Sequence, residues 1–192
     1  MTARRSVTGV LALTLALGLL PALGPPPSVA SPPRSPNAAL AAARLEGTFA
    51  LAGTVTAAQD IPGERAGSRF LRTWTLTAPC RSGSCNSARL VRRRRTASDR
   101  ITLRRRGSDY YVGSGSFYAP AMCGSRTYSR GILVPFSIAV RVTAVGQNRA
   151  GVLIVRRVRA QYTNSSRTNL TPCVSALGND AASYHGHLVS DP

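Results

Sequence analysis

The chain has 192 residues, with 25 basic side chains that are all arginine, only seven acidic side chains and a formal net charge of +18. The length suits a single domain, and the few acids form no obvious carboxylate pair of the kind that acid–base catalysis uses. A chain this basic favours anionic partners, although arginine without lysine is also typical of a GC-rich coding bias.

The first 30 residues have the pattern of a secretory signal peptide. Two arginines precede an apolar stretch over residues 10–23, and the small side chains of Ser28 and Ala30 follow a run of prolines. The apolar stretch is shorter than the roughly 20 residues of a membrane-spanning helix, and no second one follows. We therefore expect cleavage after Ala30, or earlier near Ala22, and a secreted mature protein without a membrane span.

Residues 31–44 are rich in proline and alanine and lack an amphipathic period. This composition predicts a flexible leader. The remaining residues, 45–192, are expected to form one disulfide-bonded β domain.

From residue 45 onward, apolar residues recur at every second position, which is the period of a half-buried strand. The clearest strands are predicted over residues 45–56, 70–76, 132–142 and 152–162, and weaker ones over 86–95, 100–106, 109–119 and 183–189. Arg156 occupies a position at which the alternation of its strand would place an apolar side chain. This predicts a bulge near Arg156–Arg157 or a snorkelling side chain. No segment keeps a helical period, although residues 164–182 leave room for a short helix.

About eight strands joined mainly by short turns predict an all-β protein with an antiparallel meander. Closing the meander into an up-and-down β-barrel would remove its exposed edges, so the barrel is the favoured architecture. A β-sandwich is the alternative, because it produces the same alternation of apolar and polar residues.

Four cysteines in an exported domain predict two disulfides. Cys80 and Cys85 flank a short turn and are expected to pair, which leaves Cys123 with Cys173. The loop-entropy model assigns about 2 kcal/mol to the short bridge and about 4 kcal/mol to the long one. The spacing fits zinc poorly, and the even cysteine number argues against a catalytic thiol.

The stretch from Trp74 to Cys85 has the form Trp-x4-Pro-Cys-x2-Gly-x-Cys and is followed by a strand rich in leucine and arginine. It resembles an element of small exported actinobacterial β domains, over about 20 residues of the chain. The resemblance implies an exported β domain and assigns no functional residue.

The densest charged feature consists of two arginine runs with one acid between them. If residues 96–99 form a turn, the two runs lie on adjacent strands, where like charges directly opposite each other are destabilising. The runs predict an anion-binding strip for phosphate polymers such as nucleic acid, wall teichoic acid or lipid headgroups, or else a solvated basic hairpin. The residues of this strip are Arg92, Arg93, Arg94, Arg95, Arg104, Arg105 and Arg106.

The other reactive side chains predict neither a catalytic nor a metal site. His185 and His187 share one face of a strand, but no usual motif supplies the third ligand of a zinc site. The sequence Gly113-Ser-Gly-Ser116 lacks the form of a nucleophile elbow, and its glycines predict curvature or a bulge. We expect a non-enzymatic protein without a cofactor.

Three functions follow, in this order of preference. The first is a secreted binding domain that engages an anionic cell-envelope polymer or nucleic acid through the arginine runs. The second is a small barrel that carries an apolar ligand in its interior, where space would be left by Gly47, Gly53, Ala139 and Ala160. The third is a protease inhibitor that presents Arg81 between two bridged cysteines.

Overall fold

The computed structural model describes residues 35–61, 63–94, 97–173 and 177–191. The predicted signal peptide and its cleavage site lie outside this part of the chain. Within it, no helix has both the length and the apolarity needed to cross a membrane. The elements are α1 (Pro36–Ala42), β1 (Gly47–Gln59), β2 (Arg69–Thr77), β3 (Ser87–Arg93), β4 (Ser98–Arg105), β5 (Tyr110–Cys123), β6 (Arg126–Gln147), β7 (Leu153–Asn164), β8 (Thr168–Asn169) and β9 (Asn179–Ser190).

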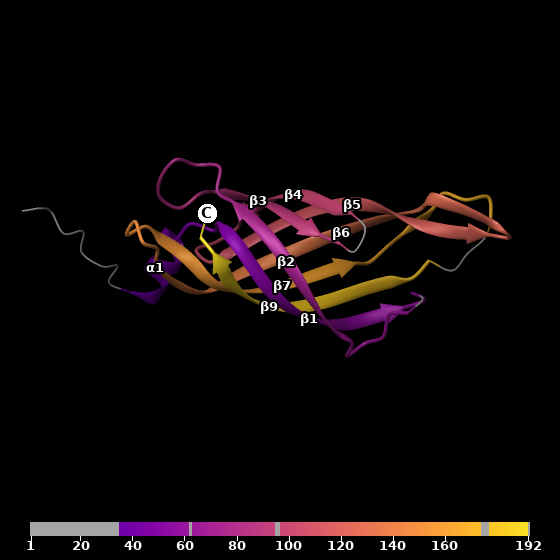
Figure 1. The fold of residues 1–192 in the computed structure, drawn as a ribbon, viewed down its shortest axis with the longest axis horizontal. Helices are drawn as coiled ribbons and strands as arrows, with labels where there is room; N and C mark the ends of the chain where they lie inside the picture. The colour runs from indigo at the N-terminus through magenta and orange to yellow at the C-terminus, as the bar shows by residue number, and fades with distance from the viewer. Residues whose placement is uncertain (1–34, 62, 95–96, 174–176, 192) are drawn as a thin grey trace, which may run out of the picture. The chain divides into compact units, whose positions relative to one another are not determined.

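Eight of these strands close into an antiparallel up-and-down barrel (Figure 1). From β1 to β7 each strand pairs with the next, β7 pairs with β9, and β9 returns to β1. The two-residue β8 is an extra strand on β6. The prediction of a meander barrel is therefore confirmed, and the sandwich alternative is not found. Closure satisfies the backbone edges that a flat sheet would expose.

The period of two in the sequence places one face of each strand inside the barrel. Phe49 and Trp74 are fully buried there, and Phe136 is 4% exposed. The space beside Gly53 is also filled, because a Cβ atom at this position would lie 2.4 Å from the Phe70 ring. Around these residues the interior of the barrel is therefore a packed apolar core. Burial of this apolar surface is the main favourable contribution to folding.

Two irregularities of the wall follow from particular residues. The register between β6 and β7 shifts so that Val142 faces Val158 while Val145 faces Val155, which confirms an irregularity near Arg156–Arg157. At Gly113, a Cβ atom would lie 2.6 Å from the Thr102 carbonyl oxygen. Glycine at this position permits the close approach of β4 and β5.

Part of the segment that was expected to be a flexible leader is structured. The Ser35 side chain caps α1 by accepting a hydrogen bond from the Ala38 amide, and Pro36 occupies the first turn. The Arg105 Nη2 atom donates to the Ala41 carbonyl at 2.7 Å, at the other end of the helix. This seven-residue helix is too short to show a helical period, and contacts with the barrel hold it.

The two disulfides have the predicted pairing. Cys80 bonds to Cys85, and Cys123 bonds to Cys173, so all four cysteines are paired. The first bridge closes the loop between β2 and β3, and the second ties the end of β5 to the chain before β9. Such bridges persist in oxidising environments, and they indicate a compartment outside the reducing cytosol.

Candidate anion-binding site

The two arginine runs are divided between the inside and the outside of the barrel wall. Successive side chains in a strand point to opposite faces, so Arg92 is buried while Arg93 is exposed. Those of the predicted arginines that the structure describes therefore do not form a single strip. The alternation in the sequence could have shown this division. Ala88 and Leu90 are apolar and lie at every second position before Arg92, so all three side chains belong to the same, inner face of β3.

On the outside, four exposed arginines of β3 and β4 form a regular zigzag, which we call the arginine ladder. The register places Arg93 opposite Ser98, Arg100 opposite Val91, Arg89 opposite Thr102 and Arg104 opposite Ser87. Along the strand axis the order is thus Arg93, Arg100, Arg89 and Arg104, alternating between the strands. Each step advances two residues, or roughly 7 Å, and crosses about 4.8 Å between strands.

The arginine ladder is an uncompensated positive surface. Each of its members faces a neutral residue across the strand pair, which avoids the direct opposition of like charges that the runs suggested. Among the residues that the structure describes, none of the four takes part in an ion pair. The only acid of β3 and β4 is Asp99, and its side chain is buried on the inner face.

On the inside, Asp99 holds two arginines of the same runs. The Arg92 Nη2 atom lies 2.6 Å from Asp99 Oδ2, and the Arg94 Nε atom lies 3.0 Å from the same oxygen. The Arg92 guanidinium also lies 4.2 Å from the centre of the Phe136 ring and 5.0 Å from that of Tyr162. These contacts supply the counter-charge and the aromatic surface that a buried guanidinium requires.

The remaining predicted arginines have separate environments. Arg105 binds the end of α1, as described above, and its Nη2 atom also donates to the Ser108 carbonyl at 2.7 Å. Arg106 is exposed in the turn before β5, and Arg95 lies outside the described residues. Arg89 and Arg100 join the surface group, although neither belongs to the predicted strip.

The two histidines lie next to cations. His185 and His187 are exposed on the outer face of β9, where their partners on β7 are Arg159 and Arg157. In the described ranges, no three histidine, cysteine or acidic side chains come together in a way that could hold a metal ion. Neighbouring arginines make this face a poor environment for a metal cation.

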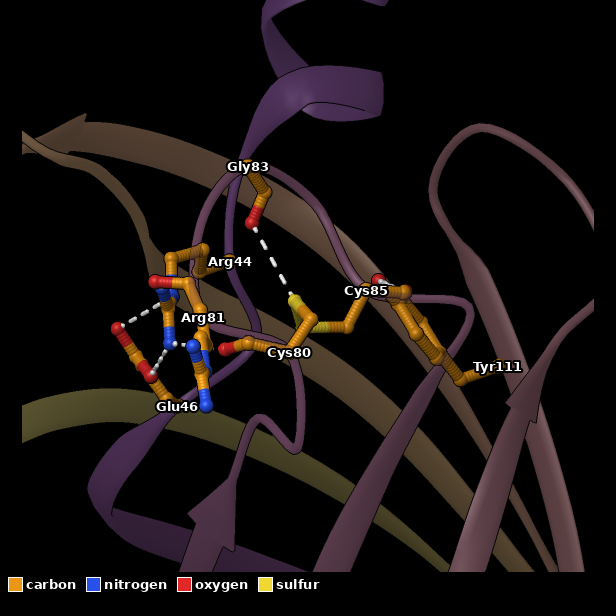
Figure 2. Close-up of a disulfide and its surroundings, with 7 residues drawn as sticks. All are labelled: Arg44, Glu46, Cys80, Arg81, Gly83, Cys85 and Tyr111. Atoms are coloured by element: carbon orange, nitrogen blue, oxygen red, sulfur yellow. Dashed lines mark hydrogen bonds and ion pairs between the residues drawn. A yellow bond between two sulfur atoms is a disulfide. The ribbon is translucent and has the colours of Figure 1, made fainter.

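The loop closed by the short disulfide is fastened to the end of the barrel by Arg44 (Figure 2). The Arg44 Nη1 atom donates to the Arg81 carbonyl at 3.0 Å, and its Nη2 atom donates to the Cys80 carbonyl at 3.1 Å. Glu46 in turn binds the Arg44 Nε atom at 2.8 Å. A serine protease must polarise the carbonyl of the residue that it recognises, and the Arg81 carbonyl is already engaged.

Comparison with protein families, with curated proteins and with solved structures finds no match to this chain.

Proposed function

We propose that this protein is an exported, non-enzymatic binding domain that holds a linear phosphate polymer along the arginine ladder. The observation that carries the proposal is the regular row of four exposed guanidinium groups, without an acid on the outer face of β3 and β4. The signal-peptide pattern before Ala30 and the two disulfides support export.

The spacing of the ladder favours a repeating anion over a single one. Three steps of roughly 7 Å give a row of about 20 Å, which a polymer with one phosphate per repeat can follow. Guanidinium groups bind phosphate oxygens through paired hydrogen bonds, and each contact releases counterions from the polymer. The row therefore gains affinity from several weak contacts along one chain.

The surface between the arginines favours a polymer without nucleobases. Their cross-strand neighbours are serine, threonine and valine, whereas proteins that bind single-stranded nucleic acid stack bases on aromatic side chains. A poly(glycerol phosphate) chain, as in cell-envelope teichoic acid, has the required backbone charge and needs no stacking. We infer that this is the class of partner.

The two other hypotheses have less support. An apolar ligand in the space that the sequence suggested beside Gly53 has no room there, because the Phe70 ring fills it. A protease inhibitor would need the Arg81 carbonyl, which accepts a hydrogen bond from Arg44.

The test measures binding to immobilised poly(glycerol phosphate) as a function of salt concentration. In the double variant Arg89→Ser/Arg100→Ser we expect weaker retention, with the slope of log affinity against log salt reduced by about 0.7 for each arginine removed. The matched control is Arg157→Ser/Arg159→Ser, which removes the same charge from exposed positions on β7. β7 lies across the barrel from β3 in the strand order.

Equal losses in the two double variants would show that binding follows net charge, and the ladder would not be the site. A parallel measurement with single-stranded DNA tests the class of polymer. Tighter binding of the DNA at the same salt concentration would overturn the assignment to a polymer without bases.

A further inference from the structure

A pocket of about 300 Å³ lies inside one end of the barrel, where β1 runs into β2. We call it the mouth pocket. Its volume is at the lower limit of the range for small-molecule sites, about 300–1,000 Å³. Its lining combines aromatic rings, four arginines (Arg69, Arg72, Arg92 and Arg94) and two acids, Glu64 and Asp180, of which Asp180 is paired with Arg167. The aromatic residues are Phe70, Phe117, Tyr162 and Tyr184.

The apolar walls of the mouth pocket consist of interlocked rings. Tyr184 packs edge-on against Phe70, with 5.6 Å between the ring centres, and lies 5.0 Å from Trp74. On the other side, Tyr162 packs against Phe136 at 5.7 Å. Rings fixed by one another in this way form a rigid surface that suits a flat apolar group.

The cationic wall retains donors that the protein itself does not use. Arg92 binds Asp99 through Nε and Nη2, and Arg94 binds the same carboxylate through Nε. Within the described ranges, no acceptor is found for Arg92 Nη1 or for the two Nη atoms of Arg94. Two guanidinium groups share one carboxylate, so this trio carries an excess positive charge.

Neutral donors lie beside these cations. Tyr162 and Tyr184 are each 5% exposed, and burial raises the pKa of both phenols, which therefore remain protonated and able to donate. Trp74 is the cross-strand neighbour of Arg92, and its buried indole N–H has no acceptor in the described part of the chain. The two tyrosines line the pocket together with Arg92 and Arg94, so charged and neutral donors share the space in which a negative group would be stabilised.

We propose that the mouth pocket binds a small aromatic anion, with the ring against Phe70 and Tyr184 and the anionic group against Arg92 and Arg94. An anionic group completes the guanidinium hydrogen bonds and balances the excess charge, and a flat ring matches the aromatic walls. This site lies on the inner face of the wall that carries the arginine ladder on its outer face. It is independent of the polymer site.

The test uses isothermal titration calorimetry with two probes of nearly the same shape, naphthalene-2-sulfonate and the neutral naphthalene-2-sulfonamide. We expect the sulfonate to bind at least about tenfold more tightly, because only its charge meets the free guanidinium donors. The fluorescence of Trp74, the single tryptophan, should change on binding, because its indole contacts the Tyr184 wall. Absence of binding, or equal affinity for both probes, would overturn the proposal.

Two variants at neighbouring positions distinguish binding in the pocket from attraction by the overall charge of the protein. Arg94→Gln should weaken sulfonate binding about tenfold, because it removes the free Nη donors. Arg93→Gln removes the same charge one residue away on the outer face and should leave the affinity unchanged. Equal losses in the two variants would place the sulfonate outside the pocket. Tyr184→Phe keeps the ring and should cost a few-fold in affinity through the lost phenol.

Discussion

The two ends of the barrel use the same chemical pair, an arginine with a carboxylate, in different ways. At the end where β1 begins, Glu46 holds Arg44, whose Nη1 and Nη2 atoms bind the carbonyls of Arg81 and Cys80 in the disulfide loop. At the mouth, Asp99 holds both Arg92 and Arg94, and several of their donors are left without a protein acceptor among the described residues. A buried ion pair thus stabilises the structure where its arginine also binds backbone carbonyls, and it offers a binding surface where hydrogen-bond donors remain without an acceptor.

The largest expected effect on stability comes from removing the Asp99 carboxylate, which Arg92 and Arg94 share at the mouth. Asp99→Asn leaves Arg92 buried without a counter-charge and should lower the free energy of unfolding by about 3–5 kcal/mol, measured by urea denaturation. The control Asp109→Asn breaks a pair with Arg141, whose side chain is 60% exposed, and should cost less than about 1 kcal/mol. Similar losses in the two variants would show that the inner pair is not buried as described.

The second prediction concerns the loss of stability when one or the other disulfide is removed. Replacing Cys123 and Cys173 by serine should cost about 4 kcal/mol, against about 2 kcal/mol for Cys80 and Cys85, because the long bridge restricts the unfolded chain more. Thermal or urea unfolding of the two double variants measures the difference. A larger loss for the short bridge would show that its attachment to Arg44 contributes more than its loop entropy.

The third effect concerns the ion pair between Arg44 and Glu46, at the end of the barrel where β1 begins. Glu46→Gln should cost about 1–3 kcal/mol, because Arg44 loses a charged partner but keeps the Cys80 and Arg81 carbonyls. Hydrogen exchange should show faster exchange in the loop between β2 and β3, with the mouth unchanged. Faster exchange at the mouth as well would contradict the separation of the two ends.

The smallest effect depends on pH at the rim of the mouth pocket. Burial and then the charge of Asp180 raise the pKa of Glu64 above its ordinary value, while Arg167 and Arg72 lower it. The folded protein therefore binds this proton more tightly than the unfolded chain does. The resulting stabilisation is present below the ordinary pKa and is lost as the pH rises through the raised one.

The measurement compares wild type with Glu64→Gln by urea unfolding between about pH 4 and pH 7. The stability of wild type should fall relative to the variant as the pH rises. Naphthalene-2-sulfonate, which stays ionised throughout, should also bind wild type less tightly at the upper end, because ionised Glu64 repels it. Parallel pH profiles for the two proteins would rule out a role for Glu64.

Most of the fold could be predicted, because its determinants are local. Each long strand carries its own alternation, and Cys80 and Cys85 are separated by only five positions, which favours their pairing. The short helix α1 was not predicted, because seven residues are too few to show a helical period and distant contacts such as the one from Arg105 add to its local cap. For the candidate site, the sequence predicted which strands carry the arginines. It did not predict which of these arginines lie inside the barrel and which lie on its outer surface.

By itself, the sequence determined an all-β domain, its disulfide pairing and a strongly basic character, because alternation, cysteine spacing and charge are properties of short segments. Only the tertiary structure decided which arginines meet solvent and which meet Asp99, since the register of β3 against β4 assigns each side chain a partner across the strands. The mouth pocket likewise exists only after closure, which brings Tyr162 of β7, Tyr184 of β9 and Arg92 of β3 to one cavity. Charges and rings far apart in the chain become a site because a closed barrel gives them a common interior.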